Sequence, residues 1–128
     1  MGMITDHFSE NEMKCKSSGD CKMVPEFMDA LEMVRVDLGK PMIVSSGYRC
    51  PEYNDQVSSS GLTGPHTTGR AVDIVCSGGD ALKLIELGLK HGMTGIGVFQ
   101  KGEHNKRFIH LDMLIPHMSK PRPWIWSY

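Results

Sequence analysis

Three side chains with metal-binding atoms stand at spacings that suit a zinc site. His66 and Asp73 lie seven positions apart on either side of Gly69, and His110 follows in the segment 107–113. Two imidazole nitrogens and one carboxylate oxygen make a three-ligand set, which leaves the fourth position of a tetrahedral zinc open for water. Because an open position is typical of a zinc that performs chemistry, this set predicts a catalytic metal, Zn²⁺.

Two predicted strands give the aspartate and the second histidine fixed positions. The apolar segment 71–75 is predicted to be a strand, so Asp73 sits on a rigid element. Residues 108–113 also predict a strand, and its alternation places His110 and Asp112 on one face. A carboxylate beside an imidazole can orient the ring, so we predict that Asp112 is a hydrogen-bond partner of His110.

The rest of the pattern predicts a small α+β domain with a mainly antiparallel sheet and packed helices. Apolar residues recur at spacings of three and four over 25–38, with Pro25 in the first turn and Gly39 as the C-terminal cap. The other predicted segments are an irregular lead-in (1–22), a buried strand (41–46), helices (52–57 and 79–92) and a hairpin (strands 95–99 and 108–113 across the turn 102–106). In the helix 79–92, the predicted apolar face consists of Ala81, Leu84, Ile85 and Leu89.

An aromatic, proline-containing tail ends the chain at 118–128. It is too apolar to be free in solvent, so we expect it to pack on the domain. We interpret Trp124, Trp126 and Tyr128 as core side chains; the alternative is that they line a substrate groove.

The composition is that of an ordinary globular chain. Its 128 residues suit one domain, 1–128, with 40% hydrophobic and 23% charged residues. The formal net charge is −1, and no block of Lys and Arg indicates a nucleic-acid face. No run approaches the roughly 18 apolar residues of a membrane span. The polar, acidic N-terminus lacks the pattern of a signal peptide, so we expect a cytoplasmic chain or one that leaves by a route not written in it.

Four cysteines permit three full disulfide pairings, and the sequence does not choose among them. Cys15 and Cys21 have five residues between them, a wider spacing than that of a zinc knuckle, and no second close pair exists. We therefore expect reduced thiols or one adventitious disulfide rather than a structural zinc site.

Three motifs together resemble the zinc D-alanyl-D-alanine carboxypeptidase and L-alanyl-D-glutamate endopeptidase family. They are SGYRCPEYN at 46–54, HTTGRAVD at 66–73 and FIHLD at 108–112, in the order that the family has them. The likeness runs from about Phe8 to Tyr128. It implies the zinc fold shared with hedgehog-type and lysostaphin-type domains, and it assigns His66, Asp73 and His110 as the zinc ligands.

The resemblance also implies catalytic residues. Arg49 corresponds to the arginine of the family's first motif, which stands near the zinc and can stabilise an oxyanion; the alternative is an arginine that ties its turn to the sheet. Many relatives carry Glu or Asp three residues before the last zinc histidine, but here Arg107 occupies that position and cannot accept a proton. We predict His104 as the general base and Glu103 as the next candidate. The alternative is that both are solvated hairpin residues.

These expectations together predict a zinc-dependent peptidase acting on bacterial peptidoglycan stem peptides. It would be a D,D-carboxypeptidase or an endolysin-type endopeptidase in which zinc-activated water attacks the peptide carbonyl. The cell-wall substrate follows from the resemblance. We expect a monomer whose partner is the peptidoglycan peptide, with no nucleic-acid partner and no membrane insertion.

The expected setting is a phage or prophage lysin that stays in the cytoplasm until a separate membrane lesion releases it. The alternative function is a non-catalytic zinc module that binds cell wall or a protein, for example in a phage tail. The absence of an acidic residue at Arg107 favours that alternative.

Overall fold

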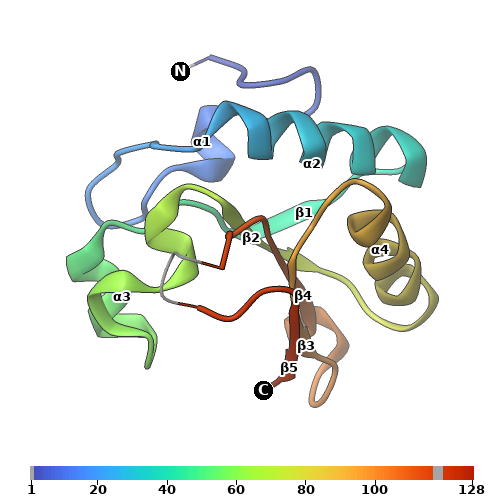
Figure 1. Cartoon of the computed structure of the whole chain (residues 1–128). Coiled ribbons are helices and arrows are strands. Elements are labelled where there is room, and N and C mark those ends of the chain that lie inside the picture. The colour runs from blue at the N-terminus through green and yellow to red at the C-terminus, as the bar shows by residue number, and fades with distance from the viewer. Residues whose placement is uncertain (1, 117–119) are drawn as a thin grey trace.

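A computed structural model describes residues 2–116 and 120–128 of the chain. Five strands form one mixed sheet in the order β1-β2-β4-β3-β5, and the two longest helices pack on one of its faces (Figure 1). Neighbouring strands are antiparallel except for the parallel pair β3 and β5. The helices are α1 (Glu10–Met13), α2 (Pro25–Leu38), α3 (Pro51–Val57) and α4 (Gly78–Lys90), and the strands are β1 (Ile43–Ser46), β2 (Ala71–Val75), β3 (Gly95–Phe99), β4 (Phe108–Asp112) and β5 (Trp124–Ser127).

The two faces of the sheet differ because side chains alternate along each strand. Val72, Ile109 and Leu111 are fully buried against the face that α2 and α4 cover. The intervening residues, among them Asp73 and His110, therefore point to the opposite face. The hydrophobic core and the polar side chains of the site thus share the same central strands.

The strand register lines up one residue from each of four strands. Asp73 on β2 pairs with His110 on β4, His110 pairs with Gly97 on β3, and Gly97 pairs with Trp126 on β5. Directly opposed residues on adjacent strands point to the same side of a sheet. The register therefore forms a row of site-facing positions across the middle of the sheet.

Several predicted elements are confirmed. Helix α2 has the predicted bounds, buries Phe27 and Leu31 on its apolar face, and ends at Gly39 with φ of 74°. The hairpin of β3 and β4 and the α+β class with a mainly antiparallel sheet are confirmed as well. Among the described residues, no helix has the length and hydropathy needed to cross a membrane.

Two predictions about burial were wrong. The strand predicted to be buried at 41–46 is the edge strand β1, where Ile43 is 65% exposed. Ile43 pairs with Val75, which lies on the same face of the sheet as Asp73, so its side chain points away from α2 and α4. On α4, Leu89 was expected on the apolar face, but it is 57% exposed, and Leu87 is buried in its place.

The interpretation of the tail aromatics as core was also wrong. Residues 124–127 form strand β5 at the other edge of the sheet, where they pair with β3 although the sequence pattern predicts no strand there. Trp124 is 56% exposed and Tyr128 is 48% exposed, because their side chains lie on the face that carries no long helix. The tail does pack on the sheet; residues 118 and 119 of the predicted tail lie outside the described residues.

Candidate metal centre

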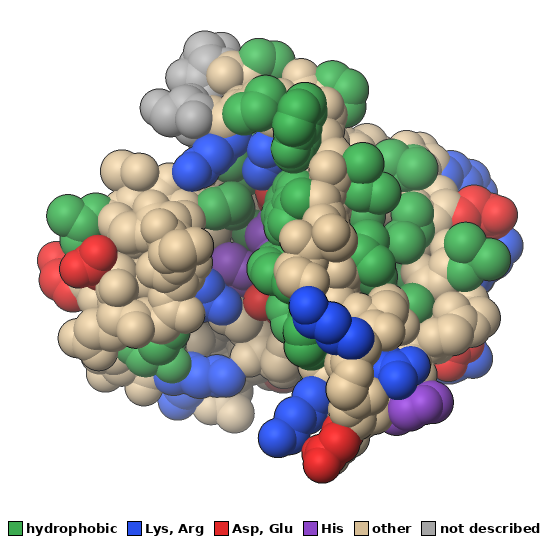
Figure 2. All heavy atoms as spheres, turned by 90° about the horizontal axis from the view of Figure 1, so that it is seen from below, with side chains coloured by type: hydrophobic (Ala, Val, Ile, Leu, Met, Phe, Trp, Pro, Cys, Tyr) green, Lys and Arg blue, Asp and Glu red, His purple; other side chains and the backbone are tan. Residues whose placement is uncertain are grey.

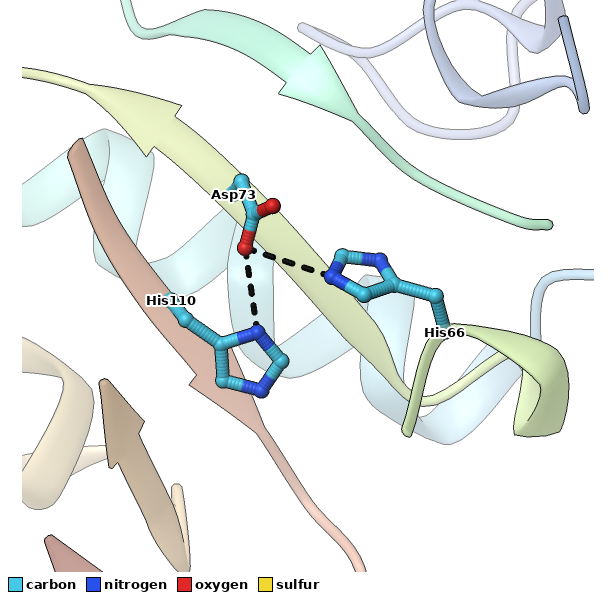
Figure 3. Close-up of side chains that lie close together, drawn as sticks. All are labelled: His66, Asp73 and His110. Atoms are coloured by element: carbon cyan, nitrogen blue, oxygen red, sulfur yellow. Dashed lines mark hydrogen bonds and ion pairs between the residues drawn. The ribbon is translucent and has the colours of Figure 1, made fainter. Parts of the chain in front are cut away.

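The three predicted zinc ligands come together on the face of the sheet away from α2 and α4. His66 lies on the 3₁₀ turn Pro65–Thr68, Asp73 at the middle of β2, and His110 at the middle of β4. Asp73 Oδ1 is 3.2 Å from Nε2 of His66 and 3.0 Å from Nδ1 of His110 (Figure 3). All three residues are buried. One carboxylate oxygen thus lies between two imidazole nitrogens.

The far nitrogen of each ring is held by an oxygen outside the cluster. Nδ1 of His66 is 2.8 Å from the carbonyl oxygen of Gly47, which can only accept, so this nitrogen donates. Nε2 of His110 is 2.7 Å from Oδ2 of Asp112, in the position predicted for an orienting carboxylate. These contacts fix both ring orientations and direct His66 Nε2 and His110 Nδ1 toward Asp73.

This donor set fits a zinc ion. One ligand atom from each residue lies within 4.8 Å of the others. Two ligand atoms on a tetrahedral zinc are about 3.3 Å apart, given bonds of about 2.0–2.2 Å. The observed separations of 3.2 and 3.0 Å are close to that value. Within the part of the chain described, this is the one group of three or more such residues with the required proximity.

Burial and hydrogen bonding shift the pKa values of all three residues in the cluster. Burial raises the pKa of Asp73, but the imidazoles of His66 and His110 outweigh it and hold the pKa well below its usual range. Burial lowers the pKa of His66 and so favours its neutral form. Burial also opposes protonation of His110, but hydrogen bonds to Asp112 and Asp73 outweigh it and raise the pKa to about 9. A metal binding at neutral pH would therefore displace a proton from His110.

Arg49 stands beside the cluster and is held at three positions. Its side chain is 16% exposed, and Nη2 is 3.5 Å from Asp73 Oδ2. Nε donates to Ser46 Oγ at 3.0 Å, and Nη1 donates to Oδ1 of the buried Asn54 at 3.1 Å. Residues of the motif 46–54 therefore hold one another in place: Ser46 on β1 and Asn54 on α3 fix the guanidinium of Arg49 at the edge of the site. Contacts to both the turn and the carboxylate are compatible with either predicted role of Arg49.

Arg122, in the C-terminal tail, supports the centre, although no motif in the sequence indicates this role. Its Nε and Nη2 donate to the two carboxylate oxygens of Asp112 at 3.0 and 2.8 Å, and the side chains are 4% and 0% exposed. Burial raises the pKa of Asp112, but hydrogen bonds from His110 and Arg122 lower it on balance. A continuous chain of polar contacts thus runs from Arg122 through Asp112 and His110 to Asp73.

Two glycines on β3 make room for this arrangement. A Cβ atom on Gly95 would lie 2.3 Å from Asp112 Oδ1, and one on Gly97 would lie 2.8 Å from the Trp126 ring. The Trp126 ring also packs on His110 with centroids 5.0 Å apart. Glycine inside a strand often marks a place where another group approaches the backbone closely. The glycines at 95 and 97 could therefore have indicated that this face of β3 is tightly packed.

A pocket of about 560 Å³ opens above the cluster of His66, Asp73 and His110. Figure 2 shows histidine atoms at the bottom of a hollow, with basic side chains at its rim and hydrophobic side chains along one wall. The volume is in the range typical of small-molecule sites. Besides the three ligands, the pocket is lined by the basic residues Arg49, Lys120 and Arg122 and the aromatic residues Phe108, Trp124, Trp126 and Tyr128.

The structure does not bring the two predicted bases into this pocket. Glu103 and His104 are exposed in the turn between β3 and β4, with His104 opening the 3₁₀ turn His104–Lys106. Neither residue lines the pocket, and among the described residues of its lining Asp73 has the one carboxylate side chain. Their assignment as general base stays a prediction.

Comparison with protein families assigns the chain to a class. The model of the family Peptidase M15 matches residues 6–112, so the chain belongs to that peptidase family. M15 peptidases are zinc-dependent, which agrees with the histidine–aspartate–histidine cluster and with the resemblance seen in the sequence. No curated protein matches the chain. The family match ends at Asp112, so Arg122 and strand β5 lie beyond it.

Proposed function

We propose that the chain is a zinc peptidase that hydrolyses peptide bonds in bacterial peptidoglycan stem peptides. The observation that carries the proposal is the cluster of His66, Asp73 and His110 at the bottom of an open pocket in a chain of family M15. Three protein ligands at an accessible site are typical of catalytic zinc, whereas structural zinc is usually closed by four.

The residues around the cluster support hydrolysis. A zinc ion held by the three ligands would supply a Lewis acid and lower the pKa of water. Arg49 places a fixed positive charge at the pocket edge, where it can stabilise the negative charge that develops on a peptide carbonyl oxygen. Asp112 keeps the His110 ring in one orientation, and the Trp126 ring covers one side of that imidazole.

The pocket lining also supports a peptide with carboxylate groups. Arg49 and Lys120 are basic residues of the lining, and stem peptides carry free carboxylates that such groups bind. Trp124 and Tyr128 offer exposed aromatic surface against which an extended peptide can pack. We further propose a phage or prophage lysin that acts on the wall after release from the cytoplasm, an extension that rests on the family resemblance.

A second candidate is a zinc-containing module that binds cell wall or a protein without hydrolysis, for example in a phage tail. One specific observation favours it. Within the described part of the chain, Asp73 has the one carboxylate side chain in the pocket lining, and the predicted bases Glu103 and His104 lie outside that lining. A peptidase needs a group that takes a proton from water.

Purified peptidoglycan distinguishes these candidates. The chain is loaded with zinc and incubated with sacculi, and the soluble products are analysed by mass spectrometry. A carboxypeptidase releases free D-alanine, and an endopeptidase releases stem peptides with new amino termini. His66→Ala is expected to lose zinc and all product release. Zinc bound by the wild type without any product would establish the binding module, and no zinc after reconstitution would refute both.

A further inference from the structure

Two cysteine thiols lie against each other although they are 35 residues apart in the chain. The Sγ atoms of Cys15 and Cys50 are 3.5 Å apart, and the backbone N–H of Cys50 donates to Cys15 Sγ at 3.3 Å. Cys15 is fully buried and Cys50 is partly exposed. A disulfide holds its sulfurs about 2.05 Å apart, so the two atoms need to approach by about 1.5 Å.

The backbones that carry these thiols are already in contact. Tyr48 N–H donates to the Met13 carbonyl at 2.8 Å, and Lys16 Nζ donates to the Ser45 carbonyl at 2.6 Å. A Cβ atom on Gly47 would lie 2.8 Å from Met13 Cα, so the two segments touch at the main chain. The approach of the two sulfurs therefore requires side-chain adjustment rather than a rearrangement of the fold.

The thiols of Cys15, Cys21 and Cys76 differ in the direction in which their pKa values are shifted. Burial raises the pKa of the Cys15 thiol, but the N–H of Cys50 and hydrogen bonds from Ser18 outweigh it and lower the pKa to about 6. Burial raises the pKa of Cys76 to about 11 and also raises that of Cys21. Because the thiolate is the reactive form, Cys15 is the cysteine suited to attack a neighbouring disulfide.

We propose that Cys15 and Cys50 are a disulfide-forming pair that closes when the chain meets a small-molecule disulfide. The thiol of the partly exposed Cys50 first attacks the oxidant, loses its proton to solvent and forms a mixed disulfide, and one small thiolate leaves. The Cys15 thiolate then attacks Cys50 Sγ and expels the second small thiolate. Two protein thiols lose two electrons in total, and the oxidant disulfide is reduced to two thiols.

The bridge would join the N-terminal segment to the loop that carries Arg49. Cross-linking residues 35 apart removes conformational freedom from the unfolded chain and so raises stability. It would also restrain the peptide that directly follows Arg49. Neither thiol is part of the metal-ligand cluster, so the proposal does not depend on the proposed peptidase function.

Oxidised glutathione tests the proposal on the purified chain. After incubation, free thiols are alkylated and the chain is digested with trypsin, which places Cys15 in the dipeptide 15–16 and Cys50 in the peptide 50–70. The expected result is a loss of two of the four thiols, a product that joins these two peptides, and a rise in Tm of about 10 °C that dithiothreitol reverses.

Matched variants identify the pair. Cys21→Ser with Cys76→Ser is expected to keep both the cross-link and the rise in Tm. Cys50→Ser, at a partly exposed position, is expected to abolish them without preventing folding. Retention of all four thiols in the wild type would overturn the proposal. So would glutathione left on Cys50 as the final product, or a cross-link that includes Cys21 or Cys76.

Discussion

Replacing Arg122 with methionine tests whether the tail helps to build the metal centre. Arg122 donates two hydrogen bonds to Asp112, whose Oδ2 is 2.7 Å from His110 Nε2. The variant leaves a fully buried carboxylate without its cation, so Asp112 is less restrained and holds the His110 ring less firmly. Partners of this kind typically contribute 10- to 100-fold to metal affinity, and we expect zinc affinity to fall by roughly 30-fold.

The stability change sets the conditions of the experiment. Removing one partner of a buried ion pair costs about 3–5 kcal/mol. We expect the lower end, because Asp112 keeps His110 and also accepts a hydrogen bond from the N–H of Leu114 at 3.3 Å. Zinc affinity is therefore measured at a temperature where every variant is folded, by competition with a chromophoric chelator at neutral pH. Arg122→Lys keeps the charge but loses the two-point contact, and an intermediate loss is expected.

Two further variants show whether Arg122→Met weakens zinc binding by releasing Asp112 and His110 or by destabilising the whole chain. Arg35→Met removes the same charge from α2, on the opposite face of the sheet, and should leave zinc affinity unchanged. Asp112→Asn combined with Arg122→Met should weaken zinc binding by less than the product of the single effects, because both act through His110. A folded Arg122→Met chain whose zinc affinity stays within twofold of the wild type would refute the reasoning.

Three further predictions follow from other parts of the structure. If His104 is the general base, His104→Ala should lower kcat at least 100-fold with little change in KM. A loss of kcat below tenfold would refute this assignment. Gly97→Ala places a Cβ atom 2.8 Å from the Trp126 ring, so an overpacking cost of about 1–3 kcal/mol is expected in chemical denaturation, with wild-type stability as the contrary result. A hydrogen bond to His91 lowers the pKa of Asp37, so its stabilising effect is present above about pH 4 and is lost as the pH falls through the lowered value. Asp37→Asn should accordingly lower Tm at pH 6 but not at pH 2, and an equal change at both pH values would contradict this.

Local patterns predicted the elements that hold the site. Alternation over 108–113 correctly placed His110 and Asp112 on one face of a strand. The apolar spacing over 25–38 predicted α2 with its observed bounds, because side chains three and four apart share a helix face. The spacing of His66 and Asp73 pointed to their shared cluster, since a short turn and a strand separate them.

The exposure of the aromatic side chains in the tail could not be predicted from a local pattern. Hydrophobic composition indicated that Trp124 and Tyr128 pack on the domain, but composition does not say which face of the sheet they join. Their exposure depends on the parallel pairing of β5 with β3, which the intervening chain does not encode as a local pattern. The same pairing brings Trp126 over His110.

The sequence by itself indicated the kind of chemistry, because residue type and spacing are local properties of the motifs around His66, Asp73 and His110. Only the tertiary structure decided which distant residues complete that centre and which thiols can pair. Arg122 meets Asp112 through the path of the tail, and Cys15 meets Cys50 because α1 packs beside β1. Contacts of this kind depend on how elements pack in space, and no periodicity along the chain records them.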